Sequence, residues 1–158
     1  MDKSRDRLRE NEVAVDVPSP SDAQLRFIGT IRTPWKTREE CPRQGDTDGP
    51  ECRVELHGPW EAALSGLAEY RMVELIYWLD RSRRDLVLQS PKGDGRTVGT
   101  FALRSPVRPN PIGTALVRLV RLEPTALVVR GLDCLDRTPL LDIKPDRCAF
   151  SPQARPKG

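Results

Sequence analysis

The chain has 158 residues, of which 37% are hydrophobic and 31% are charged, with 26 lysines and arginines against 23 aspartates and glutamates. This length suits a domain with its own core, and no run approaches the 18 apolar residues that a membrane-spanning helix needs. The amino terminus lacks the apolar segment of a secretory signal, so we expect a cytoplasmic protein with reduced thiols and no membrane association.

Charge is distributed unevenly along the chain. Residues 101–158 carry ten basic against five acidic residues, whereas residues 1–100 carry 16 against 18. A basic carboxyl-terminal half is compatible with an anionic partner such as RNA or a nucleotide. The four cysteines and the single histidine, His57, show no zinc-ligand spacing, so no metal site is expected.

The first part of the chain predicts an arm followed by two strands. Residues 1–24 are charged and then rich in proline and serine, which is typical of a disordered arm. Residues 25–31 alternate well enough for a strand, and a loop rich in charge, proline and glycine follows at 36–50. Residues 52–57 then predict a short strand with Val54 and Leu56 on one face.

The middle of the chain predicts one short helix and a series of strands. Residues 58–67 carry apolar side chains at helical spacing after Pro59, and Gly66 predicts an early end. Alternation predicts strands at 71–79, 86–88, 98–103, 115–122 and 126–132, and a short strand closed by Pro145. Glu123-Pro124-Thr125 predicts a hairpin turn. We therefore expect a mainly β fold, a small antiparallel β-barrel with one short helix, and no nucleotide-binding Rossmann domain.

The segment 104–113, Arg-Ser-Pro-Val-Arg-Pro-Asn-Pro-Ile-Gly, is the most informative part of the sequence. Three prolines in six positions fix the backbone and remove donors, which excludes an ordinary helix or a central strand. A stiff loop loses little entropy when a ligand orders it. It therefore presents Arg104 and Arg108 to a ligand, with Arg108 as a candidate phosphate contact, while Asn110 before Pro111 is expected to brace the turn.

Three segments together resemble the TsaA/TrmO-type family of S-adenosylmethionine-dependent methyltransferases. They are residues 28–36 with Pro42-Arg43-Gln44, residues 101–113, and residues 132–145, which end in Asp142-Ile143-Lys144-Pro145. The resemblance implies a TsaA-like β-barrel over residues 25–146, followed by a polar tail at 147–158. It also implies a homodimer with S-adenosyl-L-methionine bound near the subunit interface, and methylation of N6 in a modified adenosine of tRNA.

The resemblance also implies a set of site residues. Asp80 and Arg81 are included in it because many members have a His-Gln pair at that place. The residues implied to bind the methyl donor are Pro42, Arg43, Gln44, Asp80, Arg81, Arg104, Asp133, Cys134, Leu135, Asp136 and Arg137. The residues implied to bind the substrate are Arg108, Asn110 and Lys144. No residue is assigned as a catalytic acid or base.

The chemistry of the donor fits these residue types but leaves individual roles open. An arginine, Arg43 or Arg104, could pair with the donor's carboxylate, and Asp133 or Asp136 with its ammonium or ribose hydroxyls. Asp136 could equally serve turn formation alone. Other expectations are that Asp142 pairs with Lys144, that Trp35 lines the cleft, and that Trp60 and Trp78 lie in the core.

Three functions follow as hypotheses. The first is a methyltransferase acting on tRNA. The second is a barrel that binds S-adenosylmethionine or a nucleoside without turnover, as a sensor or accessory protein, because Asp146 stands where family members usually carry an aromatic residue. The third, a barrel that only binds single-stranded nucleic acid, is disfavoured because aromatic residues make up 5% of the chain and most lie in apolar runs.

Overall fold

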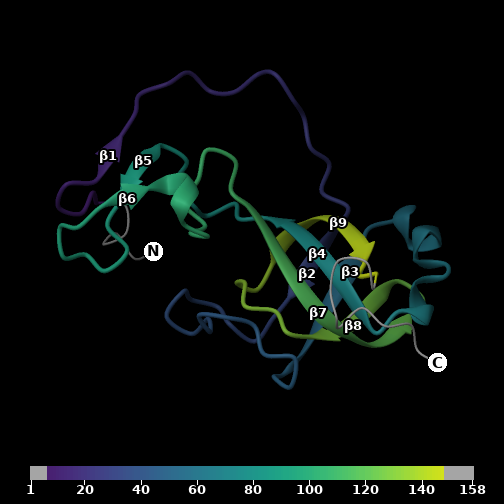
Figure 1. Ribbon diagram of the computed structural model, residues 1–158. Coiled ribbons are helices and arrows are strands. Elements are labelled where there is room, and N and C mark those ends of the chain that lie inside the picture. The colour runs from purple at the N-terminus through teal and green to yellow at the C-terminus, as the bar shows by residue number, and fades with distance from the viewer. Residues whose placement is uncertain (1–6, 148–158) are drawn as a thin grey trace. The chain divides into compact units, whose positions relative to one another are not determined.

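The computed structural model describes residues 7–147 of the chain (Figure 1). The chain divides into two compact units, which we describe separately. Among the described residues, the barrel unit comprises Leu25–Trp78 and residues 113–147, and the second unit comprises residues 7–24 together with Leu79–Ile112. The predicted tail falls almost entirely on residues 148–158, which lie outside the described residues.

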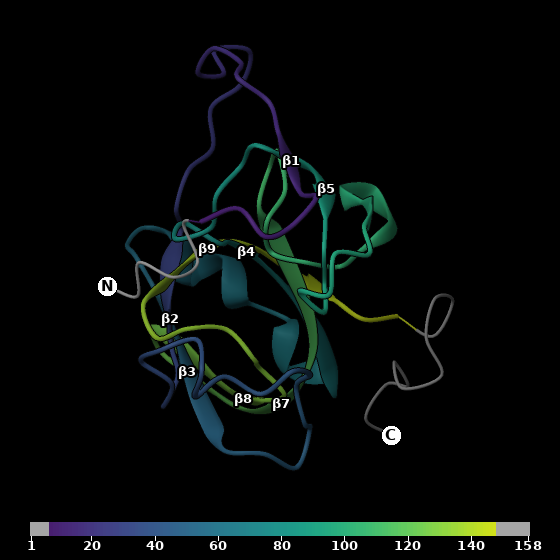
Figure 2. The same ribbon diagram turned by 90° about the vertical axis from the view of Figure 1, so that its left-hand side faces the viewer.

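The barrel unit is a closed antiparallel β-barrel of six strands, as the sequence predicts. Its strands follow each other around the barrel in the order β2-β3-β8-β7-β4-β9, and Figure 2 shows this ring of strands. The predicted hairpin is present, because Glu123 of β7 pairs with Ala126 of β8. The six strands are β2 (Gly29–Arg32), β3 (Glu51–Leu56), β4 (Met72–Trp78), β7 (Ile112–Glu123), β8 (Ala126–Arg130) and β9 (Thr138–Pro145).

The barrel core consists of the inward-facing members of these alternating strands. On β3 the buried residues are Cys52, Val54 and Leu56, and on β4 they include Val73 and Leu75. β8 departs from alternation because four successive residues, 126–129, are buried. Side chains thus fill the barrel interior, as expected for a barrel of this small strand number.

The predicted helix at 58–67 forms as two short 3-10 helices. η1 (Trp60–Leu64) and η2 (Leu67–Glu69) are separated by Gly66, whose φ of 87° lies in the left-handed region. The early end predicted from Gly66 is confirmed, because that backbone conformation interrupts any right-handed helix. Trp60 was expected in the core, but it is 37% exposed. That expectation is wrong, because in η1 it is Leu64 whose side chain is buried.

The second unit contains a three-stranded antiparallel sheet in the order β1-β5-β6. The sequence predicts a strand at 98–103, but β6 stops at Gly99 and η3 (Thr100–Ala102) follows. The amino-terminal segment, predicted as a disordered arm, contributes β1, and Arg9 donates to the carbonyl of Ser90 at 2.8 Å. The strands are β1 (Val13–Ala14), β5 (Leu86–Gln89) and β6 (Val98–Gly99).

The proline-rich segment is braced by side chains within the second unit. Gln89 donates to the carbonyl of Val107 at 2.8 Å and to the hydroxyl of Thr100 at 2.9 Å. That hydroxyl in turn donates to the carbonyl of Leu86 at 2.7 Å. The bond to Val107 gives a carbonyl of this segment a partner, and the buried bonds of Thr100 complete the network around Gln89, because an unpaired buried polar group is costly.

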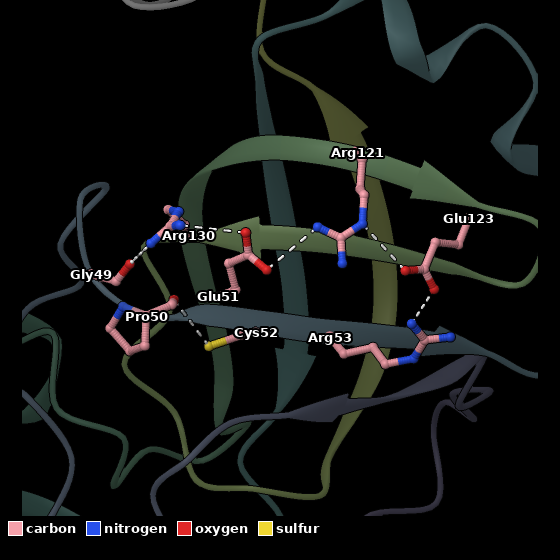
Figure 3. Close-up of polar contacts among 8 residues, drawn as sticks. All are labelled: Gly49, Pro50, Glu51, Cys52, Arg53, Arg121, Glu123 and Arg130. Carbon is pink, nitrogen blue, oxygen red and sulfur yellow. Dashed lines mark hydrogen bonds and ion pairs between the residues drawn. The ribbon is translucent and has the colours of Figure 1, made fainter.

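An ion-pair network crosses the outer face of the barrel over the adjacent strands β3, β8 and β7 (Figure 3). Arg130 lies 3.3 Å from one oxygen of Glu51, and Arg121 lies 3.4 Å from the other. Arg121 also pairs with Glu123 at 3.4 Å, and Glu123 pairs with Arg53. The hydrogen bond from Arg53 lowers the pKa of Glu123. The network ties neighbouring strands at a fixed register.

We expect substitution of a core leucine to destabilise the barrel strongly. Leu75 on β4 is fully buried, whereas Leu116 on β7 is 37% exposed. Leu75→Ala should lower the free energy of unfolding by about 2–5 kcal/mol, because a cavity adds to the lost burial. Leu116→Ala is the matched control and should cost clearly less. Urea unfolding monitored by tryptophan fluorescence measures both, and equal losses would contradict the assigned core.

Candidate functional site

One end of the barrel carries two long loops that the sequence places far apart. Ile31 of β2 pairs with Thr138 of β9, and Glu51 of β3 pairs with Arg130 of β8. The loops 33–50 and 131–137 therefore both leave the barrel at this end, which we call the rim. β4 also ends here, because Tyr77 pairs with Leu140. Eight of the predicted donor-binding residues lie in these two loops: Pro42, Arg43, Gln44, Asp133, Cys134, Leu135, Asp136 and Arg137.

Hydrogen bonds pin the 131–137 loop to the start of the 33–50 loop. The hydroxyl of Thr33 donates to the carbonyl of Cys134 at 2.8 Å, and the amide of Thr33 donates to Oδ1 of Asp136 at 3.1 Å. The amide of Asp136 donates to the carbonyl of Trp35 at 2.7 Å. Asp136 thus connects the two loops through both its side chain and its backbone.

The turn at Arg137 completes this arrangement. Arg137 has a φ of 67°, in the left-handed region, and its amide donates to the carbonyl of Ile31 at 2.8 Å. The hydroxyl of Thr138 donates to the carbonyl of Leu135 at 2.6 Å. The hydrogen bonds on both sides of this turn hold Arg137 in a backbone conformation that is unfavourable for a residue other than glycine.

The tip of the 33–50 loop also contacts the 131–137 loop. Gly45 lies against the backbone carbonyl of Gly131, and any side chain at Gly45 would overlap that carbonyl. The close approach requires glycine and holds the preceding residues beside the pinned loop. Arg43 and Gln44 are exposed there, while Pro42 is half-buried.

Asp133 is the carboxylate with the most unusual surroundings at the rim. It is half-buried, and the hydroxyl of Tyr77 donates to its Oδ1 at 3.3 Å. Burial raises the pKa of Asp133, an effect that the Tyr77 hydrogen bond and its own backbone amide partly oppose. A carboxylate that is costly to keep ionised and sits at a loop cluster is a candidate ligand contact.

Cys134 is buried, whereas its neighbours Asp133 and Leu135 are half-buried. Its side chain is buried, and burial raises the pKa of its thiol to about 12. The thiol is therefore neutral and faces the interior, so a ligand at the rim could meet Cys134 only through its backbone. Trp35, expected to line a cleft, is half-buried and its carbonyl accepts the Asp136 amide.

The predicted residues of the segment 79–112 belong to the second unit and are described within it. Asp80, Arg81 and Arg104 are exposed. Arg108 donates to the carbonyls of Leu103 at 2.7 Å and Ser105 at 3.1 Å, so it braces the proline-rich loop. Its predicted contact with substrate stays a prediction, as does the convergence of this segment with the two rim loops.

Asn110 acts as a brace through a residue that the sequence analysis did not single out. Arg84 donates to Oδ1 of Asn110 at 3.2 Å and to the carbonyl of Pro109 at 2.7 Å. Pro111 is fully buried, and its carbonyl accepts the amide of Leu79 at 2.8 Å. The expected bracing role of Asn110 has a partner in Arg84, which no local pattern indicates.

Lys144 lies away from the rim. It pairs with Glu74 across β9 and β4, six residues along β9 from Thr138. At about 3.3 Å per strand residue this places it roughly 20 Å from the rim. Its ammonium lies 3.6 Å from Asp142, so the expected ion pair is present. The structure does not bring Lys144 together with the donor-binding candidates.

The basic excess of residues 101–158 is partly neutralised on the barrel. Arg121 and Arg130 pair with Glu51 (Figure 3). Arg118 lies 3.5 Å from Asp48. These arginines are less available to a polyanion than their number suggests. Among residues 7–147, no group of three or more histidine, cysteine or acidic side chains could hold a metal ion. Nor is any helix of this range long and apolar enough to cross a bilayer.

Comparison with known proteins identifies a matching family and several relatives of this chain. Residues 30–150 match the family described as the tRNA-methyltransferase O N-terminal domain. The probable S-adenosyl-L-methionine-binding protein VirR of Rhizobium radiobacter is 57% identical over 148 residues, which cover 94% of this chain and 85% of that protein. The putative S-adenosylmethionine-dependent methyltransferase RcsF of Pseudomonas aeruginosa is 35% identical over 125 residues, 75% of this chain and 52% of that protein.

A solved structure also has a fold similar to that of this chain. The crystal structure of TrmO from Pseudomonas aeruginosa aligns with a TM-score of 0.69 at 32% identity, covering 82% of this chain and 58% of that one. This chain therefore spans less than two thirds of the length of that protein, and the shared part includes the barrel.

We expect the burial of Asp133 to reduce stability at neutral pH. Because its folded pKa lies above the ordinary value of 3.8, the folded protein binds this proton more tightly than the unfolded chain does. The free energy of unfolding therefore falls as pH rises from 3.8 through the folded pKa. Asp133→Asn removes this titration, so the variant should be more stable than wild type at pH 7, and the gain should shrink toward pH 3.

Urea unfolding at pH 3, 5 and 7 measures this effect. Asp142→Asn, which changes an aspartate paired with Lys144 toward the far end of β9, controls for replacing an aspartate as such. A loss of stability in Asp133→Asn at pH 7 would contradict the assigned environment.

Proposed function

The chain belongs to the tRNA-methyltransferase O (TsaA/TrmO-type) family, and we propose that it binds S-adenosylmethionine at the rim and transfers its methyl group to N6 of a modified adenosine in tRNA. The observation that carries this proposal is the pinning of the 131–137 loop to the 33–50 loop. It gathers acidic and basic candidate residues, remote in sequence, at one end of the barrel.

The residues at the rim fit the chemical groups of the donor. Asp133 offers a half-buried carboxylate, which suits an ammonium or a pair of ribose hydroxyls. Arg43 offers an exposed guanidinium two residues before the Gly45 contact, which suits the carboxylate of the amino-acid part. Asp136 is already used by the Thr33 amide, so Asp133 is the better candidate of the two acids.

When bound, S-adenosylmethionine would supply a methyl group on a sulfonium: in-line attack by N6 would form the N–C bond, break the S–C bond to leave the neutral thioether, and release the N6 proton to water. The chain's own residues then need only to orient donor and acceptor and to exclude water. The pinned loops favour this role, because a fixed backbone loses little freedom on binding. We assign no general base to this chain.

The acceptor and the partner are also part of the proposal. A tRNA substrate is supported by the family to which the chain belongs. A cytoplasmic location is proposed with it, because the substrate would have to be met where tRNA is present. A homodimer is supported by Phe101, which is 82% exposed on η3 in the same segment as Arg104. Val87, Leu88 and Val98 of the same unit are exposed as well, and several exposed apolar side chains, unlike a single one, suit a surface that a second copy covers.

A second candidate function is a barrel that binds S-adenosylmethionine without turnover, as a sensor or accessory protein. VirR, 57% identical over nearly the whole chain, is described as a probable S-adenosyl-L-methionine-binding protein. Asp146, which replaces the aromatic residue expected after Lys144-Pro145, favours the same alternative.

Binding of the donor should depend on the rim residues. We expect Arg43→Ala to weaken S-adenosylmethionine binding roughly 10- to 100-fold, because it removes a charge-assisted hydrogen bond. Lys144→Ala removes a cation that lies on β9 away from the rim. This variant is the matched control and should bind like wild type. Isothermal titration calorimetry measures the affinities, with light scattering of the same samples for the dimer. Equal effects of the two substitutions would place the donor elsewhere.

Methyl transfer should be detectable on tRNA. We expect incubation of the protein with S-adenosylmethionine and tRNA carrying the unmethylated threonylcarbamoyl-adenosine to yield its N6-methylated form, measured by nucleoside mass spectrometry. Asp133→Asn should reduce the yield, because it weakens the donor contact. Saturable donor binding without any methylated nucleoside would favour the non-catalytic alternative instead.

A further inference from the structure

Tyr77 connects two sequence motifs that have no pairing signal between them. It lies near the end of β4, is 3% exposed, and pairs with Leu140 at the rim. Its ring lies directly over Gly113, the last residue of the Arg-Pro-Asn-Pro-Ile-Gly motif, and a methyl group at Gly113 would overlap the ring carbons. Glycine at this position therefore creates the space that the tyrosine ring occupies.

The other end of Tyr77 reaches the candidate donor site. Its hydroxyl donates to Oδ1 of Asp133 at 3.3 Å, from the strand β4 to the 131–137 loop. Packing against Gly113 restricts the movement of the Tyr77 ring, so the hydroxyl stays close to the carboxylate of Asp133. The carboxylate of Asp133 is held by this bond and by its own backbone amide.

We propose that Tyr77 is a positioning residue for donor binding, which orients the Asp133 carboxylate so that it accepts a hydrogen bond from the ammonium or the ribose hydroxyls of S-adenosylmethionine. This inference rests on the proposed function. Tyr77 does not itself need to touch the donor, because it acts through Asp133.

The electrostatics of the site support this role. Burial raises the pKa of Asp133, and the Tyr77 hydroxyl lowers it. The neighbouring thiol of Cys134, and Cys52 of β3 beside it, have pKa values raised to about 12 and about 11 by burial, so both are neutral at ordinary pH. Tyr77 therefore helps to keep Asp133 ionised in surroundings that disfavour the charge.

A buried tyrosine could also serve packing alone. In that case the ring would matter and the hydroxyl would not, so Tyr77→Phe would leave donor binding unchanged. The positioning role makes the opposite prediction, because the phenylalanine ring still fits over Gly113 while the hydrogen bond to Asp133 is lost.

The test is calorimetric titration of S-adenosylmethionine into the wild-type protein and Tyr77→Phe between pH 5 and 8. We expect Tyr77→Phe to bind roughly tenfold more weakly at pH 7, as for one lost hydrogen bond to a charged group. The loss should increase toward pH 5, because Asp133 becomes protonated at a higher pH in the variant. Tyr70→Phe, at the end of η2, is the matched control and should follow the wild-type profile.

A second readout does not require the donor. We expect carbon-13 NMR titration of the Asp133 carboxyl to give a higher pKa in Tyr77→Phe than in wild type. Repeating the calorimetry with 5′-methylthioadenosine, which lacks the amino-acid part, identifies the donor group that Asp133 meets. A loss for both ligands indicates the ribose, and a loss for S-adenosylmethionine alone indicates the ammonium; either result supports positioning.

The outcomes separate this inference from the proposed function. Wild-type binding with an unchanged affinity and pH profile in Tyr77→Phe would overturn the positioning role and leave donor binding intact. Absence of binding by the folded wild-type protein would overturn both.

Discussion

The buried hydrogen bond from Thr33 to the carbonyl of Cys134 is the interaction on which the arrangement of the candidate site depends. It lies at the rim, between the residue that follows β2 and a loop about one hundred residues further along the chain. The amide of Thr33 and the carboxylate of Asp136 reinforce it. Because a buried carbonyl without a partner is costly, the two loops are strongly favoured to stay together.

This constraint separates structural acids from those available to a ligand. Asp136 is used to hold the loops, while Asp133, three residues earlier, is half-buried at the rim with the Tyr77 hydroxyl on one oxygen. Burial makes its charge costly, and residues that reduce the stability of a fold in this way are concentrated at functional sites. The ion pairs on the outer face of the barrel, by contrast, stabilise neighbouring strands (Figure 3).

The proline-rich segment shows how far a motif can be interpreted without tertiary structure. Its stiffness is evident from Pro106, Pro109 and Pro111, because proline fixes φ wherever it occurs. Its partners are not evident: Gln89 and Arg84 bond its carbonyls from β5 and the chain before it. Arg108, expected to present its guanidinium to phosphate, donates to the carbonyls of Leu103 and Ser105 within the same unit.

The sequence by itself determined the strands of the barrel, the hairpin at 123–125 and the buried faces of β3 and β4, because alternation and turn chemistry are local properties. It also indicated the family, through three motifs. Only the tertiary structure decided that residues 79–112 lie outside the barrel unit, that Lys144 is remote from the rim, and that Gly113, Tyr77 and Asp133 form one chain of contacts. Those facts depend on the order of the strands and on contacts between segments far apart in the chain, which alternation and turn chemistry do not specify.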